Sequence, residues 1–263
     1  TKLKKEIANH ENVPFDNIII GNGSNEILEL AARAFLNPDT SSIASKHAFA
    51  VYKIVTQSAG ASMIEVPTCN WGHDLNSFAD HLEKNTRVIF IANPNNPTGT
   101  YNSHDEVYSL LKKVPSSVLV VLDCAYFEYV TKEDYVKPID LLSEFDNLLI
   151  TKTFSKIHGL ASIRVGYGIA HPTLIEVFNR IRQPFNVNTL AQAMAEVAIN
   201  DHEHIHQSIE LNSQQYDFLF DQLSKLGLEC IPSVGNFITF KGNFIGKEMF
   251  NNLIQPKQTT ALF

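Results

Sequence analysis

The sequence predicts an α/β fold with a largely parallel sheet, and two observations support this prediction. Seven short apolar runs have the length and composition of buried strands. Segments with helical periodicity lie between several of these runs. Strands that alternate with helices indicate βαβ units, in which successive strands of one sheet run parallel.

The expected strands lie within the first 170 residues. They are residues 17–20, 41–44, 62–66, 88–92, 118–122, 148–151 and 165–170. Residues 24–35 repeat apolar side chains on one helical face, and residues 103–113 begin with a capping box of Ser103 and Glu106. Later helices are expected at residues 172–182, 188–200 and 202–226.

Two unequal domains are expected. The chain has 263 residues, of which 44% are hydrophobic, and this suffices for one large core or two smaller ones. Helical periodicity breaks near Pro184, so residues 1–183 are expected to form the larger domain and residues 184–263 the interdomain helices and a smaller domain. The chain opens on Thr1 in an amphipathic helix, so we expect a fragment whose first segment is missing.

Composition excludes several classes of partner. The net charge of −7 disfavours nucleic acid and anionic membrane surfaces, and no apolar run approaches the roughly 20 residues that span a bilayer. The cysteines are few and widely spaced, which argues against disulfides or zinc and for a reducing cytoplasm, and we expect them to be small core residues. They are Cys69, Cys124 and Cys230.

A metal site is considered at three closely spaced histidines, His202, His204 and His206. Their alternate spacing would align them on a strand, but this segment has helical periodicity. On a helix the three side chains spread around the axis. We therefore expect a solvated helix start and no metal site.

Lys156 follows the strand expected at residues 148–151. A lysine there can form a Schiff base with an aldehyde cofactor, because burial and a nearby cation help it to lose its proton. Thr153 and Arg164, three residues before and eight after Lys156, can hold a phosphate. Taken singly, Lys156 is better interpreted as a solvated surface lysine, and Arg164 can equally be a surface residue.

Asp123 and Tyr126 follow the strand expected at residues 118–122. A carboxylate there is costly without a partner, and the protonated nitrogen of a pyridine ring is such a partner. A helix N-cap or an internal salt bridge is the alternative role for Asp123. The Tyr126 hydroxyl can donate to the phenolate oxygen of such a cofactor, although its position taken alone favours an ordinary half-buried tyrosine.

Three further segments can contribute to the same site. Asn96 lies in a loop stiffened by two prolines, which aims its amide accurately, although an ordinary Asn-Pro turn stays open. The backbone amides of Ser24 and Asn25 at a helix start can bind a phosphate, with a plain N-cap at Ser24 as the alternative. Phe49 can stack on a pyridine ring or pack in the core. The pattern around Ser24 lacks the last glycine of a Rossmann fingerprint and the lysine of a P-loop, so nucleotide binding is disfavoured.

Together these motifs resemble those of the fold-type I, class I/II aminotransferases, most closely the histidinol-phosphate aminotransferases. The resemblance covers about residues 1–240 and is most specific in five segments. They are residues 21–30, 70–75, 93–99, 123–129 and 153–167. It implies a three-layer α/β/α fold with an incomplete smaller α+β C-terminal domain, pyridoxal 5'-phosphate as cofactor, and a homodimer.

The resemblance also implies a role for each site residue. Lys156 would form the Schiff base and then act as general base and acid. Asp123 would pair with the pyridine nitrogen, and Phe49 would stack on the ring. Asn96 and Tyr126 would hold the phenolate oxygen. The phosphate would be held by Ser24, Asn25, Thr153 and Arg164.

The implied reaction is transamination between glutamate and imidazole acetol phosphate, which yields 2-oxoglutarate and histidinol phosphate in histidine biosynthesis. Threonine-phosphate decarboxylase or aromatic aminotransferase activity on the same scaffold, or a non-catalytic remnant, are the alternatives. Relatives carry an N-terminal arm with a tyrosine, and a C-terminal arginine that binds substrate. Arg182 is the last arginine of this chain, and residues 252–263 do not continue the family pattern. We therefore expect a chain truncated at both ends.

Overall fold

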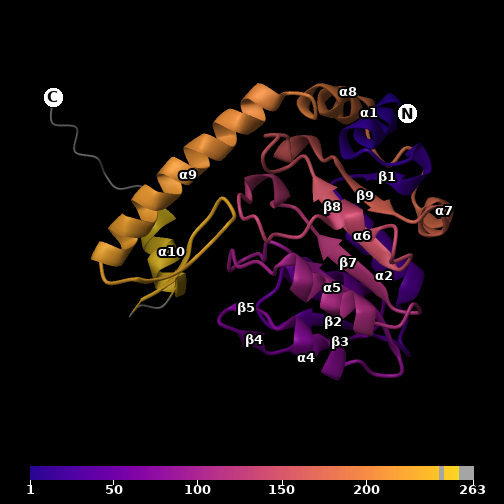
Figure 1. Ribbon diagram of the computed structural model, residues 1–263, viewed down its shortest axis with the longest axis horizontal. Coiled ribbons are helices and arrows are strands. Elements are labelled where there is room, and N and C mark those ends of the chain that lie inside the picture. Colours follow the sequence, from indigo (N-terminus) through magenta and orange to yellow (C-terminus); the bar gives the residue numbers. More distant parts are fainter. Residues whose placement is uncertain (243–245, 255–263) are drawn as a thin grey trace.

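A seven-stranded sheet forms the centre of the structure, a computed structural model that describes residues 1–242 and 246–254 (Figure 1). Its strand order is β1-β9-β8-β7-β6-β2-β3. Only β9 runs antiparallel to its neighbours, and the other pairs are parallel. The strands are β1 (Ile18–Gly21), β2 (Ser41–Ser45), β3 (Ser62–Val66), β6 (Thr86–Ala92), β7 (Leu119–Asp123), β8 (Leu148–Thr153) and β9 (Gly166–Ala170). All seven predicted strands are confirmed, with ends shifted by at most two residues.

Helices cover both faces of the sheet, which confirms the three-layer α/β/α fold. One face packs against α2 (Ser24–Phe35), α3 (Ala50–Ser58) and α7 (Pro172–Ile181). The opposite face packs against α1 (Lys2–Glu11), α4 (Leu75–Asp80), α5 (His104–Lys113), α6 (Pro138–Leu141) and α8 (Thr189–Ala198). The strand β7 contributes side chains to both cores, since Val120 and Leu122 face one and Leu119 and Val121 the other. Burial on both faces explains why its sequence is continuously apolar.

The local signals for helix starts are partly confirmed. Ser103 and Glu106 form the predicted capping box of α5. Ser24 is not an N-cap, because Gly23 takes that position with a φ of 74° and no side chain caps the helix. The helices α3, α4 and α6 were not predicted, because nine residues or fewer are too short for periodicity to identify them.

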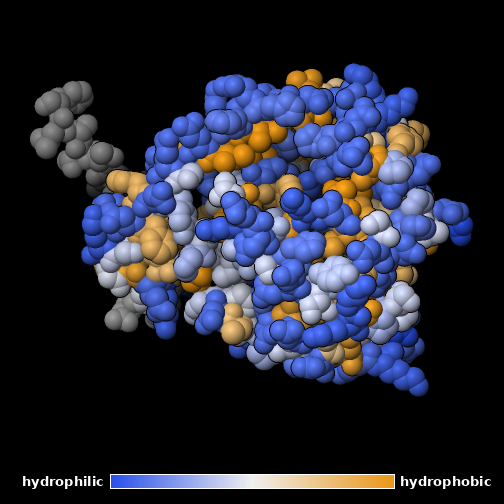
Figure 2. All heavy atoms as spheres, in the orientation of Figure 1, coloured by the Kyte–Doolittle hydropathy of each residue, from blue (hydrophilic) through white to orange (hydrophobic). Residues whose placement is uncertain are grey.

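The long helix α9 (His202–Lys225) extends away from the sheet, and Figure 1 shows the hairpin of β10 (Glu229–Ile231) and β11 (Thr239–Lys241) and helix α10 (Gly246–Ile254) beside it. No residue of α9 is buried. Figure 2 shows apolar side chains along one side of this helix, and its Leu211, Phe218 and Leu219 are exposed. The predicted boundary near Pro184 falls between α7 and α8 and stays a prediction. The chain end at 255–263 lies outside the described residues.

The cysteines do not share one environment. All three are free, and Cys124 is a buried core residue as predicted. Cys69 lies exposed in the short hairpin of β4 (Thr68–Cys69) and β5 (Gly72–His73), so the core prediction is wrong for it. Cys230 is half-buried. A turn between two-residue strands leaves too little neighbouring structure to cover Cys69.

A buried ion pair that was not predicted joins α1 to β8. The Lys152 ammonium lies 2.8 Å from the Glu11 carboxylate, and the Tyr167 hydroxyl donates to the same carboxylate at 2.5 Å. Burial raises the pKa of Glu11, but Lys152 and Tyr167 lower it more, so its net pKa lies below the ordinary value of 4.5. The stability that Glu11 contributes is therefore present above that value and is lost as the pH falls through its folded pKa.

Replacing Glu11 with glutamine is expected to lower the free energy of unfolding by about 3 kcal/mol, because it leaves the buried Lys152 ammonium without a counter-charge. Urea unfolding at neutral pH measures this change. Lys2→Met is the control, since it breaks the exposed Lys2–Glu196 pair and should change stability little. If the two substitutions lowered the free energy of unfolding equally, burial of the Glu11–Lys152 pair would not explain its contribution to stability.

Candidate active site

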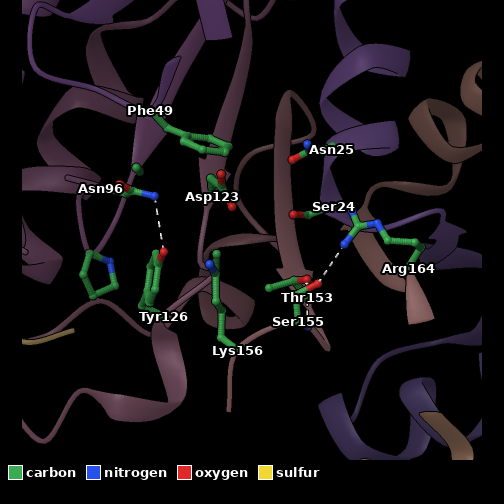
Figure 3. Close-up of a pocket in the computed structure, with 13 residues that line it drawn as sticks. Ser24, Asn25, Phe49, Asn96, Asp123, Tyr126, Thr153, Ser155, Lys156 and Arg164 are labelled. Carbon is green, nitrogen blue, oxygen red and sulfur yellow. Dashed lines mark hydrogen bonds between the residues drawn. The ribbon is translucent and has the colours of Figure 1, made fainter. Parts of the chain in front are cut away.

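All nine residues predicted to form the site line one cavity of about 200 Å³ (Figure 3). They come from the first turn of α2, from the carboxyl ends of β7 and β8, from the loops that follow β2, β6, β7 and β8, and from the turn before β9. Because β6, β7 and β8 are adjacent parallel strands, the loops after their carboxyl ends meet at one edge of the sheet. The cavity is also lined by Ala92, Pro94, Ala125 and Ser155. The structure thus brings the predicted residues together, while the role of each stays a prediction.

Asp123 lies at the floor of the cavity and is 4% exposed. Its carboxylate accepts hydrogen bonds of 2.9 Å from the Tyr52 hydroxyl and from the Thr151 hydroxyl. Burial raises the pKa of Asp123, and these hydrogen bonds and the charge of Lys156 oppose the rise. Neither alternative role holds, since within the described residues Asp123 forms no salt bridge and caps no helix. A cation in the cavity would favour its charged form.

Tyr126 and Asn96 form a pair on one wall of the cavity. The Asn96 amide donates to the Tyr126 hydroxyl at 3.2 Å. The loop that carries Asn96 is anchored by Asn93, whose side chain donates to Asn102 O and accepts from Asn102 N, each at 2.9 Å. Two rigidly held polar groups at this wall can together bind one oxygen of a ligand.

Lys156 points into the cavity between Tyr126 and Thr153, with Asp123 beyond its tip (Figure 3). Its Nζ lies 4.9 Å from the centroid of the Tyr126 ring. In the part of the chain that the structure describes, its ammonium has no hydrogen bond and no carboxylate within 4 Å. An amine that is half-buried and unpaired in a cavity is available to react with a ligand carbonyl.

The far end of the cavity can bind an anion. The N-terminus of α2 points there with free backbone amides, because Gly23 supplies no capping side chain. Arg164 lies beside it and donates to Ala161 O at 2.8 Å and more weakly to Ser155 Oγ at 3.4 Å. A Cβ on Gly23 would lie 2.4 Å from Arg164 Nη2, so glycine is needed for this close approach. The Thr153 hydroxyl accepts from Ser155 N and keeps its own proton to donate.

Three residues that support the site were not predicted: Tyr52, Thr151 and Ser155. Ser155 lines the cavity and lies between two predicted residues, so its place in the sequence could have indicated it. Thr151 reaches the site through Asp123, and Tyr52 reaches it through Asp123 and through its ring contact with Phe49. Their apolar surroundings in the sequence are typical of core positions and give no separate signal.

Residues 1–242 and 246–254 contain neither a metal-ligand cluster nor a membrane-spanning helix. No group of three or more His, Cys, Asp or Glu side chains there is arranged to hold a metal ion. No helix in the same part of the chain is both long and apolar enough to span a bilayer.

Comparison with known proteins gives consistent matches. Residues 1–255 match the family described as aminotransferase class I and II. Histidinol-phosphate aminotransferase 2 of Pseudomonas fluorescens (strain Pf0-1) is 47% identical over 253 residues, which is 96% of this chain and 68% of that protein. Histidinol-phosphate aminotransferase of Methylobacillus flagellatus is 52% identical over 225 residues, which is 86% of this chain and 61% of that protein. The chain thus spans about two thirds of the length of these relatives.

A solved structure agrees with these matches. The crystal structure of histidinol-phosphate aminotransferase from Sinorhizobium meliloti in complex with pyridoxal-5'-phosphate superposes with a TM-score of 0.88 at 26% identity. The superposition covers 92% of this chain and 66% of that chain. The sheet and the helices on its two faces therefore have the arrangement of that fold.

Proposed function

Because this chain belongs to the class I and II aminotransferases, we propose that it binds pyridoxal 5'-phosphate and takes part in transamination. The proposed reaction converts histidinol phosphate and 2-oxoglutarate into imidazole acetol phosphate and glutamate. Relatives named for this activity at 47% and 52% identity support the choice of substrate. We also propose that residues 1–183 form the cofactor-binding domain.

The observation that carries the proposal is the chemistry of the groups around one cavity. A carboxylate, a tyrosine–amide pair, an unpaired amine and an anion site face the same space. Pyridoxal phosphate presents a ring nitrogen, a phenolate oxygen, an aldehyde and a phosphate. Each group of the cofactor therefore has a partner of suitable charge and hydrogen-bonding type, and the residues present fit it.

When bound, the cofactor supplies an aldehyde that condenses with amines and a ring that withdraws electrons from the neighbouring carbon. Asp123 would hold the ring nitrogen in its protonated form and so strengthen that withdrawal. Tyr126 and Asn96 would hold the phenolate oxygen, and Phe49 would cover the ring face. Lys156 would bind the cofactor covalently and, once released by substrate, move a proton at the substrate carbon as general base and acid.

Spectroscopy during sequential addition of substrates tests the function. Pyridoxal phosphate should give a visible absorbance band with the protein, and glutamate should remove it. Imidazole acetol phosphate should restore the band and yield histidinol phosphate. A band without this product, together with carbon dioxide release from threonine phosphate, would favour the decarboxylase. A band that does not respond to any amine would indicate a non-catalytic protein.

A homodimer in the cytoplasm is the second part of the proposal. Exposed apolar side chains near α8 support self-association, since Phe185, Leu190 and Val197 are 97%, 64% and 71% exposed. Free cysteines and the absence of a disulfide framework in the sequence support a reducing compartment. Sedimentation of the purified chain tests the dimer, and a monomer at micromolar concentration would contradict it.

Replacing Arg164 with glutamine is expected to weaken pyridoxal-phosphate binding about 10- to 100-fold, because it removes a charge-assisted hydrogen bond worth about 1.5–3 kcal/mol. Absorbance titration measures the dissociation constant. Arg33→Gln is the control, since Arg33 lies exposed on α2 beside Glu29 and away from the cavity. An unchanged constant for the Arg164 variant would exclude its contact with the phosphate.

A further inference from the structure

We propose that Tyr52 is a positioning residue that holds both Asp123 and Phe49 in the arrangement that the cofactor ring requires. Tyr52 does not line the cavity, so it acts through these two residues. The inference rests on the proposed binding of pyridoxal phosphate and adds to it the residue that orients two of the ring contacts.

The hydroxyl of Tyr52 fixes one oxygen of the Asp123 carboxylate. Tyr52 is fully buried on α3, and its Oη donates to Asp123 Oδ2 at 2.9 Å. Thr151 donates to the other oxygen, Oδ1, at the same distance. With a side-chain hydroxyl donating to each oxygen and the backbone of Ala125 also hydrogen-bonded to the carboxylate, the carboxylate plane is set, and a lone pair is available to a group in the cavity.

The ring of Tyr52 fixes Phe49. It stacks on Phe90 of β6 with 4.9 Å between centroids and an interplanar angle of 7°. It also contacts the Phe49 ring, at 5.8 Å and 88°, an edge-to-face geometry that aromatic pairs favour. Phe90 is itself fully buried, so Tyr52 cannot shift without disturbing the core. Tyr52 thus links the core to Phe49, which would cover the cofactor ring, and to Asp123, which would pair with the ring nitrogen.

The hydroxyl is needed for charge as well as for position. Burial raises the pKa of Asp123, and the hydrogen bond from Tyr52 opposes that rise. Burial also raises the pKa of Tyr52 well above its ordinary value, so the hydroxyl keeps its proton and stays a donor at physiological pH. A phenylalanine would fill the same space but would leave one carboxylate oxygen without its donor.

Tyr167 provides a matched comparison. It is 2% exposed, and its hydroxyl also donates to a buried carboxylate, that of Glu11. It lines no part of the cavity. Tyr52→Phe and Tyr167→Phe therefore remove the same group from the same kind of contact, one beside the site and one away from it.

The test compares pyridoxal-phosphate affinity, the pH midpoint of the visible band and thermal unfolding in these two variants. Tyr52→Phe should weaken pyridoxal-phosphate binding about tenfold and raise the pH at which half of the visible band is lost. Without the hydroxyl the Asp123 anion is less stable, so it is less able to keep the ring nitrogen in its protonated form. Tyr167→Phe should change neither, although both variants should unfold at lower temperature. In the Asp123→Asn background, Tyr52→Phe should have no further effect on affinity.

Several outcomes would overturn the inference. One is a Tyr52→Phe variant with unchanged affinity and band. Another is a Tyr167→Phe variant that loses as much affinity, which would indicate a general loss of stability. If Tyr52→Phe does not fold, Thr151→Val is used instead, since it removes the donor to the other oxygen of Asp123. Unchanged pyridoxal-phosphate affinity in Thr151→Val would then overturn the inference. No band in the unsubstituted protein would overturn the proposed function and this inference with it.

Discussion

Replacing Lys156 with alanine is expected to abolish the visible absorbance band of the cofactor-bound protein and to lower turnover by at least about 10³-fold. General acid–base catalysis alone contributes about 10²- to 10⁴-fold, and Lys156 also supplies the covalent link. It is the one lysine among the described residues that lines the cavity. Among the residues that the structure describes, no neighbouring amine is placed to take over, since Lys152 is buried and paired with Glu11.

Two further substitutions serve as comparisons for Lys156→Ala. Lys156→Arg keeps the positive charge but cannot condense with an aldehyde, so it should also lack the band. Lys113→Ala removes an exposed lysine on α5 that contacts Asn76 and should leave the band and turnover unchanged. Turnover by the Lys156→Ala variant near the parent rate would contradict the role of this lysine.

Replacing Asp123 with asparagine is expected to lower turnover by about 10²- to 10³-fold, the range seen when one electrostatic contact to a developing charge is removed. The amide has nearly the shape of the carboxylate but carries no charge, so it cannot hold the ring nitrogen in its protonated form. Its NH2 group donates and does not accept, which leaves the Tyr52 or the Thr151 hydroxyl without its acceptor. Steady-state turnover and absorbance titration measure the two effects.

Asp134→Asn is the matched control for this substitution. Asp134 also accepts a hydrogen bond from a tyrosine, Tyr101, at 2.9 Å, but it lies exposed and outside the cavity. It should keep the parent turnover. An Asp123→Asn variant as active as Asp134→Asn would show that the buried carboxylate does not tune the cofactor.

The sheet and the site loops could be predicted because their signals are local in the sequence. Strands such as β7 are continuous apolar runs, and the capping box of α5 needs only residues 103–106. The site residues follow strand ends, and parallel strands bring such ends to one edge. This reasoning places Asn96, Asp123 and Lys156 together without any knowledge of side-chain contacts.

The buried polar contacts of the site and of the fold could not be predicted, because they join distant parts of the chain. Tyr52 is 71 positions from Asp123, and Glu11 is 141 positions from Lys152. Nothing near either residue indicates its partner. The alternative of an N-cap at Ser24 fails for a different reason, since Gly23 takes the cap position with a backbone conformation that most residues avoid.

Mapping the covalent attachment of the cofactor tests the central claim most directly. The protein is mixed with pyridoxal phosphate, reduced with borohydride to make the link permanent, digested, and sequenced by tandem mass spectrometry. Fragment ions must distinguish Lys156 from Lys152, four positions earlier. We expect a single stoichiometric adduct on Lys156. An adduct on another lysine, or scattered substoichiometric labelling of surface lysines, would contradict the account.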